Sequence, residues 1–239
     1  MRTVANRIGF GLLLSLGLAT AAPAAFAQDP VAEWQEHLGK GARAYGIAEL
    51  DIAGTEMDLA LAIAEKNFAA DDPKMITMWL NLIPMRRAQN RFEEAVVFGD
   101  KVIPALAAAG GEDNPDLMPP LVMMAATLRD LKRYDLSDAM YQRAIALHTQ
   151  YFGDAHPRTT TLLEDRAVML QRAGRQEESL KLWAEVVDLW QYGLGPNHLR
   201  EAISRRGHAD ALRQAGRLDE AAAAEKRAAE VQAIWDRGR

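Results

Sequence analysis

The sequence predicts an all-α fold, an α-solenoid built from about five helix-turn-helix repeats. Three observations lead to this prediction: a 42-residue internal repeat, apolar positions with helical spacing in each repeat, and Gly- or Pro-containing loops at the expected helix ends. The composition agrees, since 49% of the 239 residues are hydrophobic, 26% are charged and none is cysteine. A chain of this length can bury a sizeable core without disulfides.

The sequence repeats with a period of 42 residues. The turn Ala173-Gly174-Arg175 recurs as Ala215-Gly216-Arg217. The same spacing generates a column of small residues and a column of loop residues. The small column contains Ala53, Ala95, Ser137, Ser179 and Ala221, and the loop column contains Asp72-Pro73, Asn114-Pro115, His156-Pro157 and His198-Leu199. We predict a repeat domain over residues 28–239, with units near 34–75, 76–117, 118–159, 160–201 and 202–239.

Each unit is predicted to contain two helices. In the fourth unit, Leu163, Ala167 and Leu170 share one face of the first helix, and Gly174 ends it. The second helix is expected from about residue 176 to 192. One helix pair cannot bury its apolar face alone, so successive pairs should stack and share a core.

The outermost units should be more polar, because each has one face without a neighbour. His37 in the first unit and Arg205 in the last occupy the position of Trp79 in the second. The second unit is the least regular, because Pro84 and Pro104 fall inside its helices. We expect these prolines to kink or interrupt the helices.

The first 27 residues have the layout of a secretory signal peptide. Arg2 and Arg7 precede an uncharged apolar run over residues 8–19, and Ala25-Phe26-Ala27 provides an A-x-A cleavage site. Cleavage after Ala27 would place the protein in the periplasm or outside the cell, with no stable membrane insertion. The alternative is an uncleaved membrane anchor.

The repeats resemble the tetratricopeptide repeats of kinesin-light-chain type. The resemblance rests on the 42-residue period, on residues 174–184 and 135–152, and on the loop Gly153-Asp154-Ala155-His156-Pro157. It covers residues 34–239 and implies a right-handed superhelix of helix pairs. It also implies that the first helices line a concave surface that binds a protein or peptide.

Carried onto this sequence, the resemblance places several arginines in the concave groove. The candidate partner-binding residues are Tyr45, Leu80, Arg87, Val122, Arg129, Arg172, Arg206 and Arg213. Because Arg forms bidentate hydrogen bonds with carboxylates, these residues predict an acidic peptide as the partner. The alternative is that Glu164, Asp130 and Asp210 pair with these arginines and that the groove is merely polar.

Composition and motifs argue against other classes of function. The net charge is 28 − 33 = −5, which argues against nucleic-acid binding. No P-loop, H-E-x-x-H or G-x-S-x-G motif occurs, so we expect neither catalysis nor a cofactor. His156 and His198 could be metal ligands one repeat apart. Their column also contains Asp72 and Asn114, however, which favours a helix-capping role.

Three functional classes follow from the sequence. The favoured one is a non-catalytic scaffold that binds a peptide or protein segment in its groove. A second is a structural subunit that self-associates or joins an envelope complex, through the second helices or the C-terminal helix that carries Trp235. A third is a small-ligand sensor or an accessory subunit of an enzyme.

Overall fold

The computed structural model describes residues 29–238, which form ten α-helices, one short 3₁₀ helix and no strand. The predicted signal peptide, residues 1–27, lies outside the described residues. The helices are α1 (Pro30–Gly46), α2 (Leu50–Asn67), α3 (Pro73–Ala88), α4 (Phe92–Gly110), α5 (Met118–Asp130), α6 (Tyr134–Phe152), α7 (Pro157–Arg172), α8 (Gln176–Leu194), α9 (Leu199–Gln214) and α10 (Leu218–Arg237). The 3₁₀ helix η1 (Pro115–Leu117) precedes α5.

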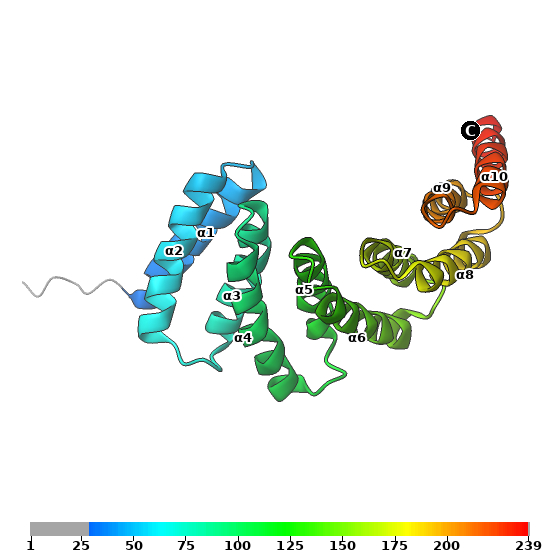
Figure 1. Ribbon diagram of the computed structural model, residues 1–239. Coiled ribbons are helices and arrows are strands. Elements are labelled where there is room, and N and C mark those ends of the chain that lie inside the picture. The colour runs from blue at the N-terminus through cyan, green and yellow to red at the C-terminus, as the bar shows by residue number, and fades with distance from the viewer. Residues whose placement is uncertain (1–28, 239) are drawn as a thin grey trace, which may run out of the picture.

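Consecutive helices form five pairs that stack into a curved row, which confirms the predicted all-α solenoid (Figure 1). In this view α5, α7 and α9 follow the inner side of the curve, and α6 and α8 follow the outer side. The pairs begin at residues 30, 73, 115, 157 and 199, three or four residues before the unit limits drawn from the sequence. No helix within residues 29–238 is long and apolar enough to cross a bilayer.

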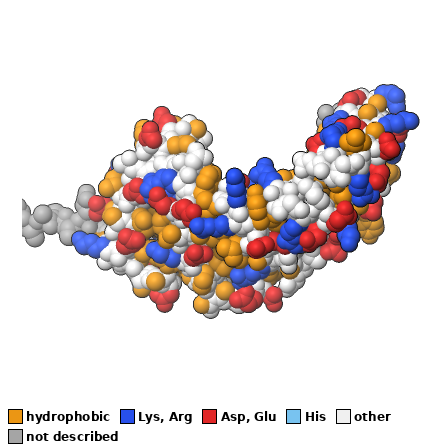
Figure 2. All heavy atoms as spheres, viewed as in Figure 1, with side chains coloured by type: hydrophobic (Ala, Val, Ile, Leu, Met, Phe, Trp, Pro, Cys, Tyr) orange, Lys and Arg blue, Asp and Glu red, His pale blue; other side chains and the backbone are white. Residues whose placement is uncertain are grey.

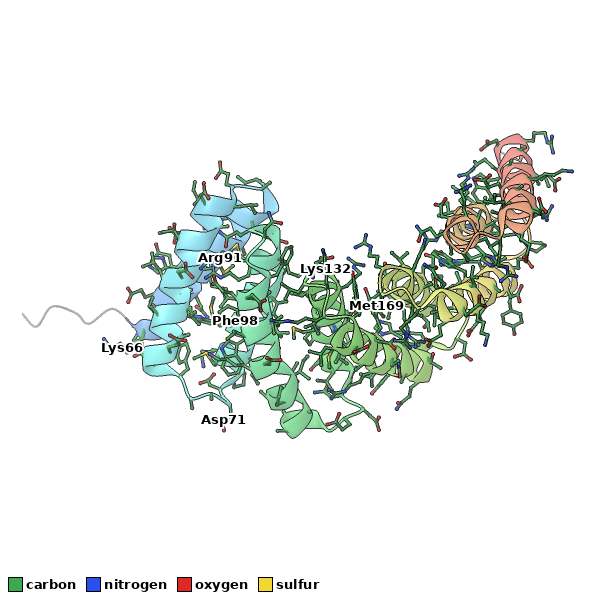
Figure 3. All side chains as sticks on the ribbon, viewed as in Figure 1. Lys66, Asp71, Arg91, Phe98, Lys132 and Met169 are labelled. Atoms are coloured by element: carbon green, nitrogen blue, oxygen red, sulfur yellow. The ribbon has the colours of Figure 1, made fainter. Side chains whose placement is uncertain are left out.

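The turn inside each pair follows the predicted spacing. One residue per turn has a positive φ, between 59° and 77°, and these residues are Ala48, Asn90, Lys132, Gly174 and Gly216. The next residue donates its N–H to a carbonyl five positions earlier, as Arg175 does to Leu170 at 2.9 Å. This is the Schellman ending of a helix, which requires the left-handed conformation. Lys132 adopts it at the top of the α5–α6 turn (Figure 3).

The loop column supplies the N-cap of the helix that opens each pair, which in the third pair is the 3₁₀ helix η1. A side chain accepts a hydrogen bond from the backbone N–H two residues later, at 2.8–3.2 Å, and these side chains are Asp29, Asp72, Asn114, His156 and His198. The structure therefore confirms the capping role of both histidines. The first cap, Asp29, lies 43 residues before the second, so the first repeat is one residue longer than the others.

The small column lies where the two helices of each pair meet. All five of its residues are buried, with at most 2% of their surface exposed. Ser137 Oγ donates to the carbonyl of Ala125 at 2.7 Å, and Ser179 Oγ donates to that of Ala167 at 2.9 Å. In these two pairs the hydroxyl therefore links the second helix to the first without requiring extra space.

The second unit is more regular than the sequence predicts. Helix α3 continues through Pro84 to Ala88, and α4 continues through Pro104 to Gly110. The expectation that these prolines interrupt their helices is therefore wrong. Pro84 lies between Ile83, which is fully buried, and Met85, which is 1% exposed, so packing holds the segment helical despite the missing N–H donor.

Arg86 occupies a core position that is leucine in the next three units. Its side chain is 2% exposed and forms an ion pair with Asp58 of α2. Its Nε lies 3.3 Å from the carboxylate of Glu94 on α4, and its Nη1 donates to Gln89 at 3.0 Å. A buried guanidinium is tolerated here because neighbouring carboxylates neutralise it.

The two ends of the stack are polar, as the sequence predicts. His37 Nδ1 lies 2.7 Å from the carboxylate of Glu56 at the first end. At the last end, Arg205 pairs with Glu201 at 2.8 Å. On α10, Glu225 stands one 42-residue repeat after Trp183. The large apolar surface that joins inner repeats is thus replaced by charge where the described stack ends.

Lys132→Gly is expected to stabilise the protein by about 1 kcal/mol, because glycine avoids the steric cost of a left-handed backbone. Urea unfolding followed by circular dichroism should show a higher midpoint for this variant. Lys181→Gly, at an exposed position inside α8, is the matched control and should lower stability by about 1 kcal/mol. A Lys132→Gly midpoint at or below that of the unmodified protein would contradict the assigned turn.

Candidate binding groove

All eight candidate residues lie on the first helices of the pairs. Tyr45 is on α1, Leu80 and Arg87 are on α3, Val122 and Arg129 are on α5, Arg172 is on α7, and Arg206 and Arg213 are on α9. The space-filling view shows a hollow along the inner side of the curve, with several Lys and Arg side chains along its floor (Figure 2). The α5–α7–α9 side of this hollow is the binding groove considered below.

Three of the arginines converge on one carboxylate in the middle of the stack. Asp130 Oδ2 lies 3.1 Å from Arg87 Nη2, and Asp130 Oδ1 lies 3.2 Å from Arg129 Nε and 4.0 Å from Arg172 Nη1. We call these four residues the Asp130 cluster. They come from three successive units, so stacking alone brings them together. One carboxylate faces three guanidinium groups, which leaves positive charge in excess.

The members of this cluster differ in how firmly they are held. Arg87 also donates to Thr127 Oγ1 at 2.7 Å and to the carbonyl of Met123 at 3.2 Å, so it links α3 to α5. Arg172, in contrast, is 54% exposed, and its only ion pair or hydrogen bond with the described residues is the 4.0 Å contact with Asp130. Arg87 therefore contributes to the fold, whereas Arg172 has donors that are free for a ligand.

A buried tyrosine lies behind the cluster. Tyr141 is fully buried, and its hydroxyl lies 3.4 Å from Arg129 Nη1. Burial and the nearby carboxyl of Asp165 raise the pKa of Tyr141 to about 12. Burial also raises the pKa of Asp165, and the charge of Arg129 opposes that rise. The ionised carboxylate of Asp165 is thus poorly solvated at neutral pH.

The last unit contributes two arginines of different character. Arg213 pairs with Asp210 at 2.6 Å and also with Glu225 of α10. Arg206 is exposed, and within residues 29–238 its side chain makes no ion pair or hydrogen bond. Arg206 is therefore a second cation in the groove that is free to meet an acidic ligand.

Of the three acids considered as internal partners of the groove arginines, two form ion pairs with them. Asp130 and Asp210 pair with groove arginines, as the alternative interpretation expected. Glu164 pairs instead with Arg200 at 3.0 Å and accepts hydrogen bonds from Trp190 Nε1 at 2.8 Å and from Ser204. Glu164 therefore does not neutralise the candidate arginines.

The apolar candidates are only partly available. Leu80 and Val122 are half-buried and pack against the core, while Tyr45 on α1 is 38% exposed. An opening with apolar walls lies at the other end of the groove, in a recess of about 620 Å³ between α7 and α9. We call it the Trp183 recess; its lining includes Val168, Arg172, Trp183, Ile203, Gly207 and Arg213.

Sequence reasoning missed this recess. Its signal was Gly207, which stands in the column of Asn81, Met123 and Asp165, where the three middle units carry a side chain. A Cβ at residue 207 would lie 2.5 Å from Trp183 Cη2. Only the absence of a side chain there lets α9 pack against the indole ring.

No group of three or more His, Asp or Glu residues among residues 29–238 could hold a metal ion. The histidines of the loop column are occupied as caps, and each also contacts an aromatic ring. His156 stacks on Phe152 with centroids 4.9 Å apart, and His198 meets Trp235 edge-on at 4.5 Å.

Comparison with protein families gives a match to part of the chain. The tetratricopeptide repeat family matches residues 116–180 and 159–233, which span the last three helix pairs. These three pairs therefore match the tetratricopeptide repeat, and the described chain as a whole is an α-solenoid of helix pairs. No curated protein shows significant sequence similarity to the chain.

Solved structures with the same fold are distant in sequence. The nearly identical TPR-like repeats of a putative kinesin light chain from Podosopora anserina superpose with a TM-score of 0.77 at 18% identity, covering 88% of this chain and 99% of that one. BtubC (BKLC) from P. vanneervenii gives 0.68 at 14% identity, over 87% of this chain and 84% of that one. MamA protein gives 0.60 at 14% identity, over 84% and 92%.

Asp165→Asn is expected to stabilise the protein at pH 7, because it removes a carboxylate that burial destabilises. The pKa of Asp165 is raised in the folded state, so the protonated form favours folding. Protonated Asp165 therefore contributes stability that is fully present below the pKa of this carboxyl in the unfolded chain, near 3.8. That stability is lost as the pH rises through the higher pKa of Asp165 in the folded protein.

Thermal unfolding of both proteins between pH 3 and pH 7 tests this prediction. The advantage of Asp165→Asn should be largest at neutral pH and should vanish in acid. Asp188→Asn, at an exposed position on α8, is the control and should change little. An Asp165→Asn variant less stable than the unmodified protein at pH 7 would show that the carboxylate is well paired.

Proposed function

We propose that this protein is a non-catalytic scaffold that binds an acidic peptide segment of a partner protein in its concave groove. Tetratricopeptide folds generally mediate protein–protein interaction, which supports the class of function. The observation that carries the proposal is the Asp130 cluster, where three arginines share one carboxylate in a chain whose net charge is −5.

The charge pattern favours an acidic partner for a physical reason. Arg172 and Arg206 have exposed guanidinium groups with free donors on the inner side of the stack. Guanidinium groups bind carboxylates through paired hydrogen bonds, and a groove with excess positive charge attracts anions over a longer range. The proposal also includes removal of residues 1–27 and action in the periplasm or outside the cell, as the signal-peptide layout suggests.

The test is binding of fluorescent acidic peptides, selected from an array, by anisotropy. Arg172→Gln and Arg206→Gln combined should weaken binding by about tenfold, which corresponds to about 1.4 kcal/mol. These two arginines are chosen because removing Arg87 would also break contacts within the fold. Arg237→Gln, near the end of α10, removes the same charge outside the groove and is the control.

Salt provides an independent measurement with the unmodified protein. Raising NaCl from 50 to 500 mM should weaken peptide binding, because added ions screen exposed charges. If the double variant and the Arg237→Gln control bind selected peptides equally well, or if no acidic peptide binds, the proposal is wrong.

A further inference from the structure

A cavity of about 420 Å³ lies at the edge of the stack where the loops between pairs run. It is bounded by the start of α5, the last turn of α6 and the first turn of α7, which adjoin one another in the stack (Figure 1). Its lining includes Pro119, Val122, His148, Tyr151, Phe152 and Arg158. Pro119 and Asp130 are about 16 Å apart along α5. The cavity is therefore separate from the Asp130 cluster.

The lining combines flat apolar surfaces with a single permanent charge. Tyr151 and Phe152 are 46% and 40% exposed, and two prolines also line the cavity. The guanidinium of Arg158 lies over the Phe152 ring, 5.5 Å from its centroid. Asp116 in η1 and Asp154 in the α6–α7 loop lie outside the lining, which contains no acidic residue. The permanent charge at the cavity is therefore positive.

One repeat further along, the equivalent arginine is paired with an internal carboxylate. Arg200 stands 42 residues after Arg158. Its guanidinium lies 3.0 Å from Glu164 and donates to Thr161 Oγ1 at 2.9 Å. Trp190 Nε1 also donates to Glu164, at 2.8 Å, so this carboxylate joins the arginine to the indole.

Arg158 lacks both of these side-chain partners. Val122 stands one repeat before Glu164, and Pro119 stands one repeat before Thr161. Neither the valine nor the proline side chain can accept a hydrogen bond. Among residues 29–238 the Arg158 side chain accordingly forms no ion pair or hydrogen bond. The cavity thus lies beside a guanidinium that has lost the carboxylate present in the next repeat.

His148 adds a second unpaired polar atom at the cavity. It stands one repeat before Trp190, and its smaller ring contributes to the open space. His148 is 8% exposed, and its Nδ1 donates to the carbonyl of Ala144 at 2.9 Å. Its Nε2 has no hydrogen-bond partner among the described residues and is not sealed from solvent. Because buried polar groups are normally paired, this nitrogen indicates a polar ligand.

We propose that this cavity binds a small aromatic carboxylic acid, whose carboxylate pairs with Arg158 as Glu164 pairs with Arg200. Guanidinium and carboxylate groups form paired hydrogen bonds, and the site offers no competing acid. The ring of the ligand packs against Tyr151, Phe152 and the prolines, because aromatic rings stack favourably on such flat surfaces. The volume is near the lower end for small-molecule sites, which favours a compact ligand over a peptide segment.

The experiment measures binding of benzoate, phenylacetate and cinnamate to the intact protein by titration calorimetry. At least one of these acids should bind with a dissociation constant below about 1 mM. The primary amide of that acid should bind at least tenfold more weakly, because it carries no charge for Arg158. Acetate should also bind at least tenfold more weakly, because it has no ring.

Substitutions at two positions locate the site. Arg158→Gln should weaken binding of the acid at least tenfold and remove its preference over the amide. Arg43→Gln removes an exposed arginine of α1 and is the matched control, which should bind as the unmodified protein does. Val122→Glu supplies an internal carboxylate, as Glu164 does one repeat later, and should prevent binding. Val122→Gln has the same size without the charge and should bind more tightly than Val122→Glu.

Absence of binding by all three acids would overturn the inference, as would equal binding of acid and amide or full binding by Arg158→Gln. Binding of the peptide Ala-Ala-Phe through its C-terminal carboxylate, without binding of the small acids, would assign the cavity to a peptide site and would also overturn it. The acidic peptides of the groove should bind Arg158→Gln normally, so this test is independent of the proposed function.

Discussion

The close approach of the two helices in each pair is the constraint on which the rest of the structure depends. Five buried small residues, spaced by 42, occupy the points of contact, and serine hydroxyls at two of them bind carbonyls of the facing helix. A larger side chain at any of these points would separate the helices and tilt the pair. Because every pair has the same geometry, the same face of each first helix lies on the inside of the curve.

That repetition gives the inner surface its electrostatic character. Arg87, Arg129 and Arg172 are far apart in sequence, yet stacking brings them to one carboxylate, Asp130. The groove thus gathers positive charge in a protein that is acidic overall. At its last two units the groove combines this charge with uncovered apolar surface around Trp183. The excess of positive charge is the basis for proposing an acidic segment as the partner.

The sequence predicted the features that repeat and missed those that depend on contacts between repeats. The period, the small column, the left-handed turn residues and the capping histidines all follow from local rules applied at one spacing. The pairing of buried Arg86 with Asp58 does not, because it joins positions 28 residues apart on neighbouring helices. The uninterrupted helices at Pro84 and Pro104, and the recess that Gly207 permits over Trp183, likewise depend on three-dimensional packing.

Hydrogen exchange measured by mass spectrometry, with and without an array-selected acidic peptide, tests the central claim most directly. The claim is that the inner face of the first helices holds the partner. The account predicts slower exchange in α5, α7 and α9 when the peptide is bound, with α6 and α8 unchanged. Protection confined to the second helices, or to the ends of the stack, would contradict it.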